Sequence, residues 1–506
     1  MQKLARNISV NLLSNIWLTL LLLVLTPIYI KILGVESYGL IGFYLSWVAV
    51  LSILDTGISS TASRELAWLS GLPNKKKEAG NLFYTLEIVY WSLVIFAGLI
   101  LFLLSYFFGS NWFDASNLSP DILKQILLLM ILSLVAQIPS GLYIGGLMGL
   151  QKQAVCSALI ALFGTLRGIG AVFTILFISS DLRAFFVWQI ILSVIQVFVM
   201  QQILWKDLGL TRQSVIFSKE ILKSVKFFAG GMILISILGI VISQSDKIIL
   251  SHLIILEDLG FYMLAWAVAS SLSRIATPIV QALGPHFTIL IAKNDKVGLV
   301  NEYRFASQVM NVLIFPTGML IAFTARSLLF AWTNDDSVAD GSSRLLSALI
   351  IGMAFAACSY PALTILYSKK NLRPVIYITI FSLIFMLPTL FLTISYFGAI
   401  GAAFCWSIYG FLSLLFYQYY GLRDFDKKDI LAISLNDFLM PFIFAMIITS
   451  IAGHYLNQLP GRIEFVLFFC LALIIACLTS TLPCKMLQSV IKTTLKKFFK
   501  DHKYLS

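Results

Sequence analysis

The stretch that decides the fold is NLLSNIWLTLLLLVLTPIYI, residues 11–30, followed by KILGVESYG, residues 31–39, and by the apolar run LIGFYLSWVAVLSIL, residues 40–54. The first run carries no charge over about the length that an α-helix needs to cross the hydrocarbon core of a bilayer. Lys3 and Arg6 precede it, and the apolar stretch is longer than a signal-peptide core and lacks a small-residue cleavage site. We therefore expect it to remain attached as the first membrane helix.

The composition extends this interpretation to the whole chain. Of the 506 residues, 59% are hydrophobic and only 12% are charged, and the mean hydropathy is +0.91. An ordinary soluble domain carries about twice that share of charge. The net charge of +12 does not indicate nucleic-acid binding, because the basic residues fall in short gaps between apolar runs. The sequence predicts an all-α, polytopic membrane protein.

Fourteen apolar runs are long enough to span a bilayer, although the count could be twelve or thirteen because the turns near Ser180 and Phe397 are short. The predicted spans are 8–30, 38–60, 82–108, 122–149, 154–178, 184–205, 227–250, 259–289, 305–331, 344–367, 374–396, 399–421, 437–456 and 463–483.

Basic residues alternate between the two sides of these spans. With a cytoplasmic N-terminus, 27 of the 36 Lys and Arg residues fall in cytoplasmic segments, and only Lys31, Arg183 and Arg462 fall on the other side. Lys and Arg accumulate in the cytoplasmic loops of membrane proteins, so the alternation supports the span count. We expect both termini to be cytoplasmic.

The loops suggest how the spans are grouped. The basic segment 206–226 separates six spans from the next six, and the last two spans form an appendage. The expected parts are an N-terminal six-helix bundle 1–205, the linker 206–226, a second six-helix bundle 227–421, a cytoplasmic loop 422–436, a helix pair 437–483 and a basic tail 484–506.

A faint internal repeat accompanies this grouping. Glu36-Ser37-Tyr38-Gly39 precedes a helix that contains an aromatic pair and a tryptophan, and Glu257-Asp258-Leu259-Gly260 precedes a similar one. Coincidences of this length are common in apolar sequence, so a true repeat and chance both stay open. A true repeat of six-span halves would have its symmetry axis along the membrane normal.

Enzymatic and metal sites are not indicated. No loop exceeds about twenty residues, and the sequence contains no Walker, GxSxG or HExxH motif. Of the six cysteines, five lie inside apolar stretches, with no CxxC pair and no histidine nearby, namely Cys156, Cys358, Cys405, Cys470 and Cys477. We expect a protein that is not an enzyme and that has no cofactor and no bound metal.

Ionisable residues inside spans are functional candidates, because a charge in hydrocarbon is costly unless it faces water or a partner. Arg167 and Arg274 lie near the middle of the fifth and eighth spans and suit a phosphate, since the guanidinium fork matches phosphate oxygens. Lys247 and Arg326 are further candidates for substrate binding, although an interfacial position explains each of them as well. Asp55, Glu87 and Asp246 are the candidates for binding a coupling ion.

One set of residues resembles a known family. Gly34, Glu36, Tyr38 and Gly39, followed by Leu54-Asp55-Thr56-Gly57-Ile58 and Arg64, are similar to the polysaccharide-transporter family that includes the Wzx O-antigen flippases. Asp246-Lys247-Ile248-Ile249-Leu250, with Gly260 and Tyr262, resembles the seventh-helix pattern of that family.

The resemblance implies the multidrug/oligosaccharidyl-lipid/polysaccharide exporter fold, with two bundles around a central cavity. The implied function is alternating-access flipping of undecaprenyl-pyrophosphate-linked repeat units of O-antigen or a similar surface polysaccharide, part of lipopolysaccharide biosynthesis, across the bacterial inner membrane. The implied partners are the lipid-linked glycan, membrane lipid, a polysaccharide polymerase and a chain-length regulator, with no nucleic acid.

Three alternatives stay open. A cation-coupled multidrug exporter of the same fold is expected to have acidic residues, rather than arginines, at the midplane. A lipid II flippase fits fourteen spans, but its pattern of arginines in the first two helices is not obvious here. A membrane glycan polymerase or ligase typically has a large outer loop, whereas the longest outer loops here, near 109–121 and 332–343, are short and acidic.

Overall fold

The computed structural model describes the chain except residues 1, 54, 71, 73–74, 117, 370–372, 460 and 490–506. Within helices, the side chains of residues 2–13, 15–16, 55–56, 108–111, 224–236 and 281–282 are also left undescribed. The described part is α-helical and contains no β-strand, only an isolated bridge between Asp114 and Ile255. This confirms the predicted all-α fold class.

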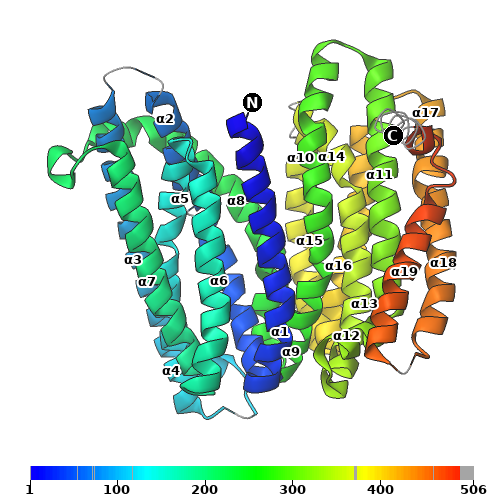
Figure 1. Cartoon of the computed structure of the whole chain (residues 1–506), viewed down its shortest axis with the longest axis horizontal. Helices are drawn as coiled ribbons and strands as arrows, with labels where there is room; N and C mark the ends of the chain where they lie inside the picture. Colours follow the sequence, from blue (N-terminus) through cyan, green and yellow to red (C-terminus); the bar gives the residue numbers. More distant parts are fainter. Residues whose placement is uncertain are drawn as a thin grey trace, which may run out of the picture. The chain divides into compact units, whose positions relative to one another are not determined.

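The chain forms two compact units, Met1–Gly260 and Phe261–Ser506. Figure 1 shows that each unit is a bundle of helices running up and down beside one another. The elements of the first unit, the last of which continues into the second, are α1 (Gln2–Leu51), the π-helix η1 (Asp55–Ser59), α2 (Ser60–Ser70), α3 (Lys76–Trp112), α4 (Pro120–Gln137), α5 (Pro139–Gly149), α6 (Gln153–Phe177), α7 (Leu182–Leu208), the 3₁₀-helix η2 (Arg212–Ser214), α8 (Lys219–Leu253) and α9 (Leu256–Ala269).

The second unit is built in the same way. Its elements are α10 (Ser271–Ala292), α11 (Lys296–Phe323), α12 (Ala325–Thr333), α13 (Asp336–Cys358), α14 (Tyr360–Ser368), α15 (Arg373–Phe397), α16 (Ala399–Gly421), α17 (Lys427–Ala432), the π-helix η3 (Ile433–Leu439), α18 (Met440–Leu456) and α19 (Arg462–Ser480).

Twelve helical segments of the described chain are long and apolar enough to cross a membrane. The sequence predicts two spans more than this. α1 holds both of the first two predicted spans, and the predicted span 227–250 lies in α8, which is 35 residues long. α8 packs against α1, α3 and η1 of the first unit. The two compact units meet inside α9, between Gly260 and Phe261, and the predicted bundle boundaries stay predictions.

Several predicted spans contain breaks that local chemistry explains. Gly34 has φ 82° and ψ 164°, a conformation that costs glycine little, and it bends α1 where the sequence predicts a loop between two spans. Pro139 starts α5 directly after α4, because proline lacks an amide hydrogen and suits the first turn of a helix. Pro361 lies in the first turn of α14 in the same way. The predicted spans 122–149 and 344–367 are thus each two helices end to end.

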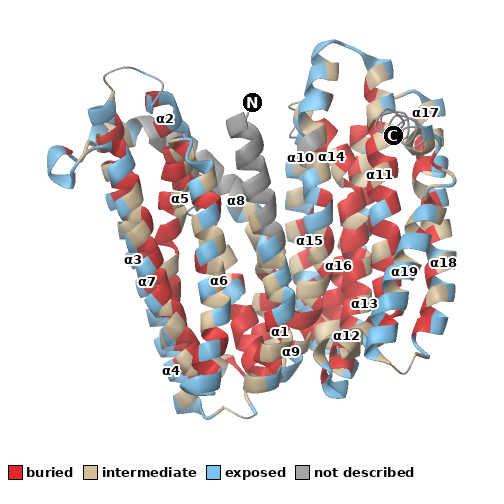
Figure 2. Cartoon of the chain, viewed as in Figure 1, coloured by how far each residue is buried: buried red, intermediate tan, exposed pale blue. Residues whose placement is uncertain are grey.

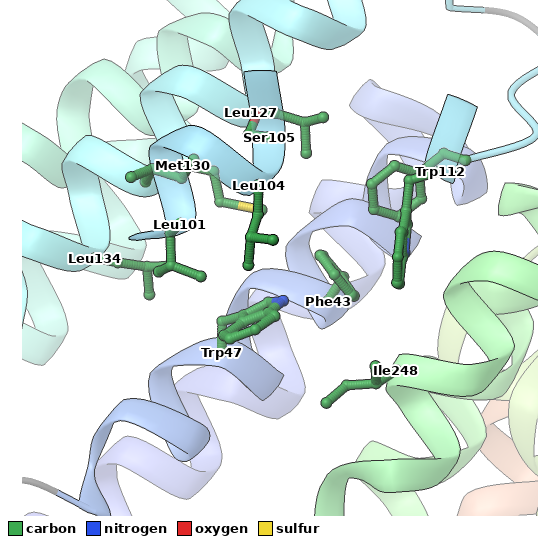
Figure 3. Close-up of a pocket in the computed structure, with 12 residues that line it drawn as sticks. Phe43, Trp47, Leu101, Leu104, Ser105, Trp112, Leu127, Met130, Leu134 and Ile248 are labelled. Atoms are coloured by element: carbon green, nitrogen blue, oxygen red, sulfur yellow. The ribbon is translucent and has the colours of Figure 1, made fainter. Parts of the chain in front are cut away.

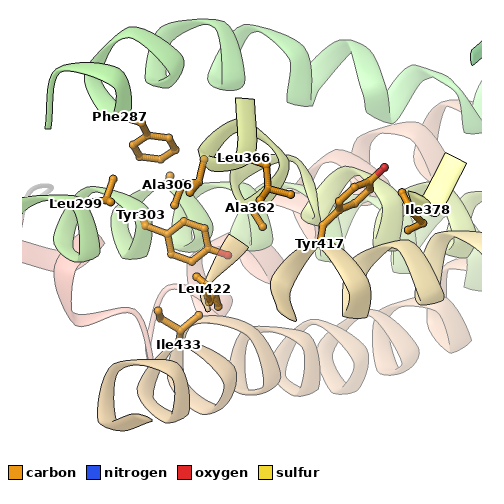
Figure 4. Close-up of a cluster of buried hydrophobic side chains, with 11 residues drawn as sticks. Phe287, Leu299, Tyr303, Ala306, Ala362, Leu366, Ile378, Tyr417, Leu422 and Ile433 are labelled. Carbon is orange, nitrogen blue, oxygen red and sulfur yellow. The ribbon is translucent and has the colours of Figure 1, made fainter. Parts of the chain in front are cut away.

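Burial within the second unit is concentrated where its helices face one another (Figure 2). Phe287, Tyr303 and Leu366 join α10, α11 and α14, and Tyr417 and Ile433 extend the same cluster to α16 and η3 (Figure 4). A separate cluster is made by α11, α18 and α19 and consists of Leu320, Leu456 and Phe465. The last helix pair is thereby packed on α11.

Candidate functional site

Arg167, on α6, lies in a cluster of polar side chains inside the first unit. Its Nη1 donates hydrogen bonds to Gln137 Oε1 on α4 at 2.9 Å and to Ser193 Oγ on α7 at 3.1 Å. Its Nη2 donates to Gln196 Oε1 at 2.7 Å. Gln189 Oε1 lies 3.4 Å from Nη1. Residues 189, 193 and 196 share one face of α7, so a single helix supplies three of the four acceptors.

All four acceptors around Arg167 are neutral, and no carboxylate of the described chain lies within ion-pairing distance of it. Tyr44 on α1 fixes one of these acceptors by donating to Gln137 Oε1 at 2.6 Å, and its hydroxyl also lies 2.9 Å from Ser133 Oγ. The guanidinium is therefore oriented by dipoles but not neutralised. A half-buried cation of this kind is suited to an anionic ligand.

Arg274, the other midplane arginine of the sequence prediction, lies on α10 in the second unit, and its side chain is exposed. Arg167 and Arg274 thus belong to different units.

Lys247 and Arg326 differ from Arg167 because their charges are balanced. Lys247, only 2% exposed, donates to the two carboxylate oxygens of Asp246 at 3.0 and 3.2 Å. Arg326 donates to Asp340 Oδ1 at 2.6 Å and to Asp336 Oδ1 at 2.9 Å. Neither residue offers an anion the uncompensated charge that Arg167 does.

Glu87, a candidate for coupling, is a buried carboxylate with three donors on one oxygen. Its Oε1 accepts from Tyr143 Oη on α5 at 2.6 Å, from Gln201 Nε2 on α7 at 2.9 Å and from Arg212 Nη2 on η2 at 2.6 Å. Arg212 is about half exposed, and its guanidinium lies 5.9 Å from the ring centroid of Trp205. The basic linker is in this way attached to a buried charge of the bundle. Asp246 is paired with Lys247, and the side chain of Asp55 lies outside the described residues.

The family-motif residues of α1 shape the backbone. Gly34 forms the bend, and Glu36 Oε1 accepts from the amide of Ser116, which holds the loop after α3. A Cβ on Gly39 would lie 2.7 Å from Leu256 O and 3.0 Å from Gly260 N, so α1 and α9 touch through backbone atoms. Gly39 and Gly260 are the equivalent positions of the suspected repeat. Tyr38, the residue directly before Gly39, is buried.

The second part of the motif lies around the π-helix η1. The carbonyl of Gly57 accepts a hydrogen bond from Thr61 Oγ1 at 2.7 Å. Arg64 is exposed on α2 and forms an ion pair with Glu65.

Sequence reasoning missed one buried charge, Asp437 on η3. Its carboxylate is fully buried and accepts from Arg304 Nε at 2.7 Å and from Gln308 Nε2 at 2.6 Å, while its backbone oxygen accepts from Asn311 Nδ2 at 2.6 Å. The signal was available: Arg304, Gln308 and Asn311 lie on one face of α11 by spacing, and an acidic residue opens the thirteenth predicted span. The amide of Leu487 donates to Gln308 Oε1 at 2.9 Å, which ties the segment after α19 to this cluster.

The first unit also holds an apolar pocket of about 260 Å³. Figure 3 shows Phe43 and Trp47 on α1, with Leu101, Leu104 and Met130 beside them. Ser105 is its only hydroxyl-bearing residue. The pocket therefore has no charged residue among its lining residues that would bind a phosphate.

Two family models match the chain. The model described as "Polysaccharide biosynthesis protein" matches residues 4–290, and the model described as "MatE" matches residues 231–392. A Shigella flexneri protein named "Putative O-antigen transporter" is 24% identical over 397 residues, which cover 76% of this chain and 90% of that protein.

Solved structures show the same fold. The lipid II flippase MurJ in an inward closed conformation is 13% identical with a TM-score of 0.73, covering 93% of this chain and 98% of that one. An inward-facing multidrug resistance MATE family transporter of the MOP superfamily is 14% identical with a TM-score of 0.68, covering 83% of this chain and 96% of that one. At these identities the likeness concerns the fold alone.

Proposed function

Because the chain belongs to the polysaccharide biosynthesis protein family, we propose that it is a flippase that moves lipid-linked oligosaccharides from the cytoplasmic to the periplasmic leaflet of the bacterial inner membrane. The substrate class is an undecaprenyl-pyrophosphate-linked repeat unit of a surface polysaccharide. The name of the Shigella relative and the transporter folds of the similar structures support the transport part of this proposal.

The observation that carries the proposal is the uncompensated guanidinium of Arg167. A pyrophosphate oxygen that replaces a glutamine oxygen exchanges a hydrogen bond to a neutral acceptor for one between two charged groups, which is the stronger kind. No buried carboxylate of the described chain has to be displaced from Arg167 first. The pyrophosphate is therefore attracted to Arg167, and the glutamine oxygens accept hydrogen bonds from Arg167 again when the ligand leaves.

The rest of the mechanism follows from the cost of moving polar groups through lipid. Only the sugar and pyrophosphate have to cross, because the isoprenoid tail stays in hydrocarbon. Without a polar path these groups would lose their hydrogen bonds to water at a cost of several kcal/mol each. A polar path that opens alternately to each side, on which Arg167 binds the pyrophosphate, removes much of this barrier.

Glu87 is the acidic residue that we assign to ion coupling. Its buried carboxylate accepts from Arg212 and so holds the linker on α3. Glu87→Gln removes that charge and should therefore reduce export that an ion gradient drives.

The deciding experiment is complementation of a strain that lacks the gene. The native protein should restore surface glycan, whereas Arg167→Gln should leave lipid-linked repeat units on the cytoplasmic side and reduce surface glycan at least about tenfold, as loss of one charged hydrogen bond predicts. Arg274→Ala should give a similar defect. Arg462→Gln is the matched control, because this exposed arginine donates only to the backbone oxygen of Ala331 among the described residues.

Normal export by a well-expressed Arg167→Gln variant would exclude this residue from the mechanism. Intact surface glycan in the deletion strain, with no second transporter gene, would contradict the flippase assignment as a whole. Accumulation of lipid II instead of repeat units would assign the substrate to the alternative flippase class, and protection of cells against cationic drugs would favour the exporter.

A further inference from the structure

Another pocket, lined by both polar and apolar residues, lies entirely in the second unit, at one end of its bundle. It has a volume of about 840 Å³ and is bordered by the end of α11, the start of α12, the start of α13, the start of α16 and the residue after α18. α11 and α18 end here whereas α13 and α16 begin here, so the pocket marks one common end of these antiparallel helices. The orientation predicted from the basic residues places this end on the periplasmic side.

One of the two arginines that line the pocket has no partner among the described residues. Both Arg326 and Arg344 line it, but Arg326 is neutralised by Asp336 and Asp340. Arg344 is exposed and makes no ion pair or hydrogen bond with any described residue. A guanidinium whose donors are not used by any described residue is suited to a phosphate.

The hydroxyl groups of the pocket add a complementary feature. Ser327 Oγ donates to Asn457 Oδ1 at 2.7 Å, Ser347 Oγ donates to Ala322 O at 2.8 Å, and Ser343 Oγ donates to Asp340 O at 3.3 Å. Each hydroxyl proton is thus used inside the protein, and each oxygen presents only lone pairs to the pocket. Such oxygens accept hydrogen bonds from a ligand rich in hydroxyl groups.

An apolar wall completes the site. Phe404, on α16, lines the pocket and is 56% exposed, with Ile351 and Ile400 beside it. An exposed phenyl ring offers a flat apolar surface to the C–H face of a sugar ring. The pocket therefore combines a guanidinium that can donate hydrogen bonds to a phosphate, serine oxygens that can accept hydrogen bonds from hydroxyl groups, and an apolar surface.

We propose that this pocket, called the Arg344 pocket, is a second binding site that takes the phosphorylated sugar of a lipid-linked glycan. The inference rests on the proposed function, because it gives the flipped head group a place to bind on the periplasmic side before release. Arg344 contacts the phosphate, the serine oxygens accept from sugar hydroxyls, and Phe404 packs on the sugar.

The test is binding of a short-chain polyprenyl-diphosphate N-acetylglucosamine to the purified full chain in neutral-lipid nanodiscs. Arg344→Gln should weaken binding about tenfold, and Arg344→Lys should restore most of it. Arg373→Gln is the matched control, since Arg373 is also exposed but lies at the start of α15, away from the pocket. Phe404→Leu should weaken binding of the sugar-bearing probe but not of polyprenyl diphosphate alone.

Two further arms identify the source of the phosphate. Glucose 1-phosphate should compete with the probe, because it presents the phosphate and the sugar that the pocket contacts, whereas nanodiscs that contain phosphatidylglycerol should leave the affinity of the probe nearly unchanged. Strong competition by phosphatidylglycerol would overturn the proposal in favour of a bilayer lipid. Equal binding by the native protein and Arg344→Gln would also overturn it. If Arg167→Gln abolished export in that case, the proposed function would stand without the second site.

Discussion

The contact between Gly39 and Gly260 allows a quantitative test of how the first unit is assembled. An ideal Cβ on Gly39 lies 2.7 Å from Leu256 O, and one on Gly260 lies 2.2 Å from Val35 O. Ordinary contact begins at 3.4 Å, so α1 and α9 would have to separate by 3.4 − 2.7 = 0.7 Å for Gly39→Ala and by 3.4 − 2.2 = 1.2 Å for Gly260→Ala. The obstructing atoms are backbone oxygens, which cannot rotate away as a side chain can.

Overpacking of this kind costs about 1–3 kcal/mol. We expect Gly39→Ala near the lower end of that range and Gly260→Ala near the upper end. The double variant should cost less than the sum, because a separation of the helices that accommodates one methyl group also accommodates part of the other.

The assay is denaturant unfolding of the purified full chain in lipid–detergent micelles. Gly284→Ala is the matched control: Gly284 also lies inside a helix, α10, but the nearest neighbour of a Cβ there is Thr364 Cγ2 at 3.6 Å, an ordinary contact. If Gly260→Ala destabilised the protein no more than Gly284→Ala, the backbone contact between α1 and α9 would not hold in the membrane protein.

Three further predictions follow from the charges and the topology. Asp437→Asn should destabilise the second unit by about 3 kcal/mol, because it breaks a buried ion pair on one side; denaturant titration measures this. The hydrogen bond from Lys369 lowers the pKa of Asp424 below its ordinary value of 3.8. The pair therefore stabilises the folded protein above pH 3.8, and this stabilisation is lost as the pH falls through the lowered pKa. Asp424→Asn should reduce the pH dependence of the unfolding free energy in that acidic range only. In a cysteine-free background, a membrane-impermeant maleimide should label Ser180→Cys but not Ser214→Cys in intact cells, and the reverse would invert the predicted orientation.

The membrane-spanning elements could be predicted because hydropathy is a local property. A helix in hydrocarbon satisfies its own backbone hydrogen bonds, so an apolar run of sufficient length specifies the element with little help from the rest of the chain. The breaks at Pro139 and Pro361 are local as well, although apolar length alone did not reveal them. The bend at Gly34 was missed because a glycine between two spans is equally typical of a loop.

The charged residues could be found in the sequence, but their roles could not be assigned, because each role depends on partners that are distant in the sequence. Arg167, Lys247 and Arg326 looked alike as cations near spans, yet only Arg167 has exclusively neutral partners among the described residues. Glu87 was identified, but its link to Arg212 joins residues 125 positions apart. Such pairs form where two helices pack against each other, and the sequence of neither helix alone specifies that contact.

The sequence by itself thus determined that this is a polytopic helical membrane protein of the polysaccharide-transporter kind, since composition, span length and the α1 motif are properties of short segments. Only the tertiary structure decided which buried charges are neutralised. Asp437 and Arg304 lie 133 residues apart, and no local pattern specifies that η3 packs on α11. A buried charge is stabilised by the dipoles and counter-charges around it, and the packing of the helices selects those neighbours.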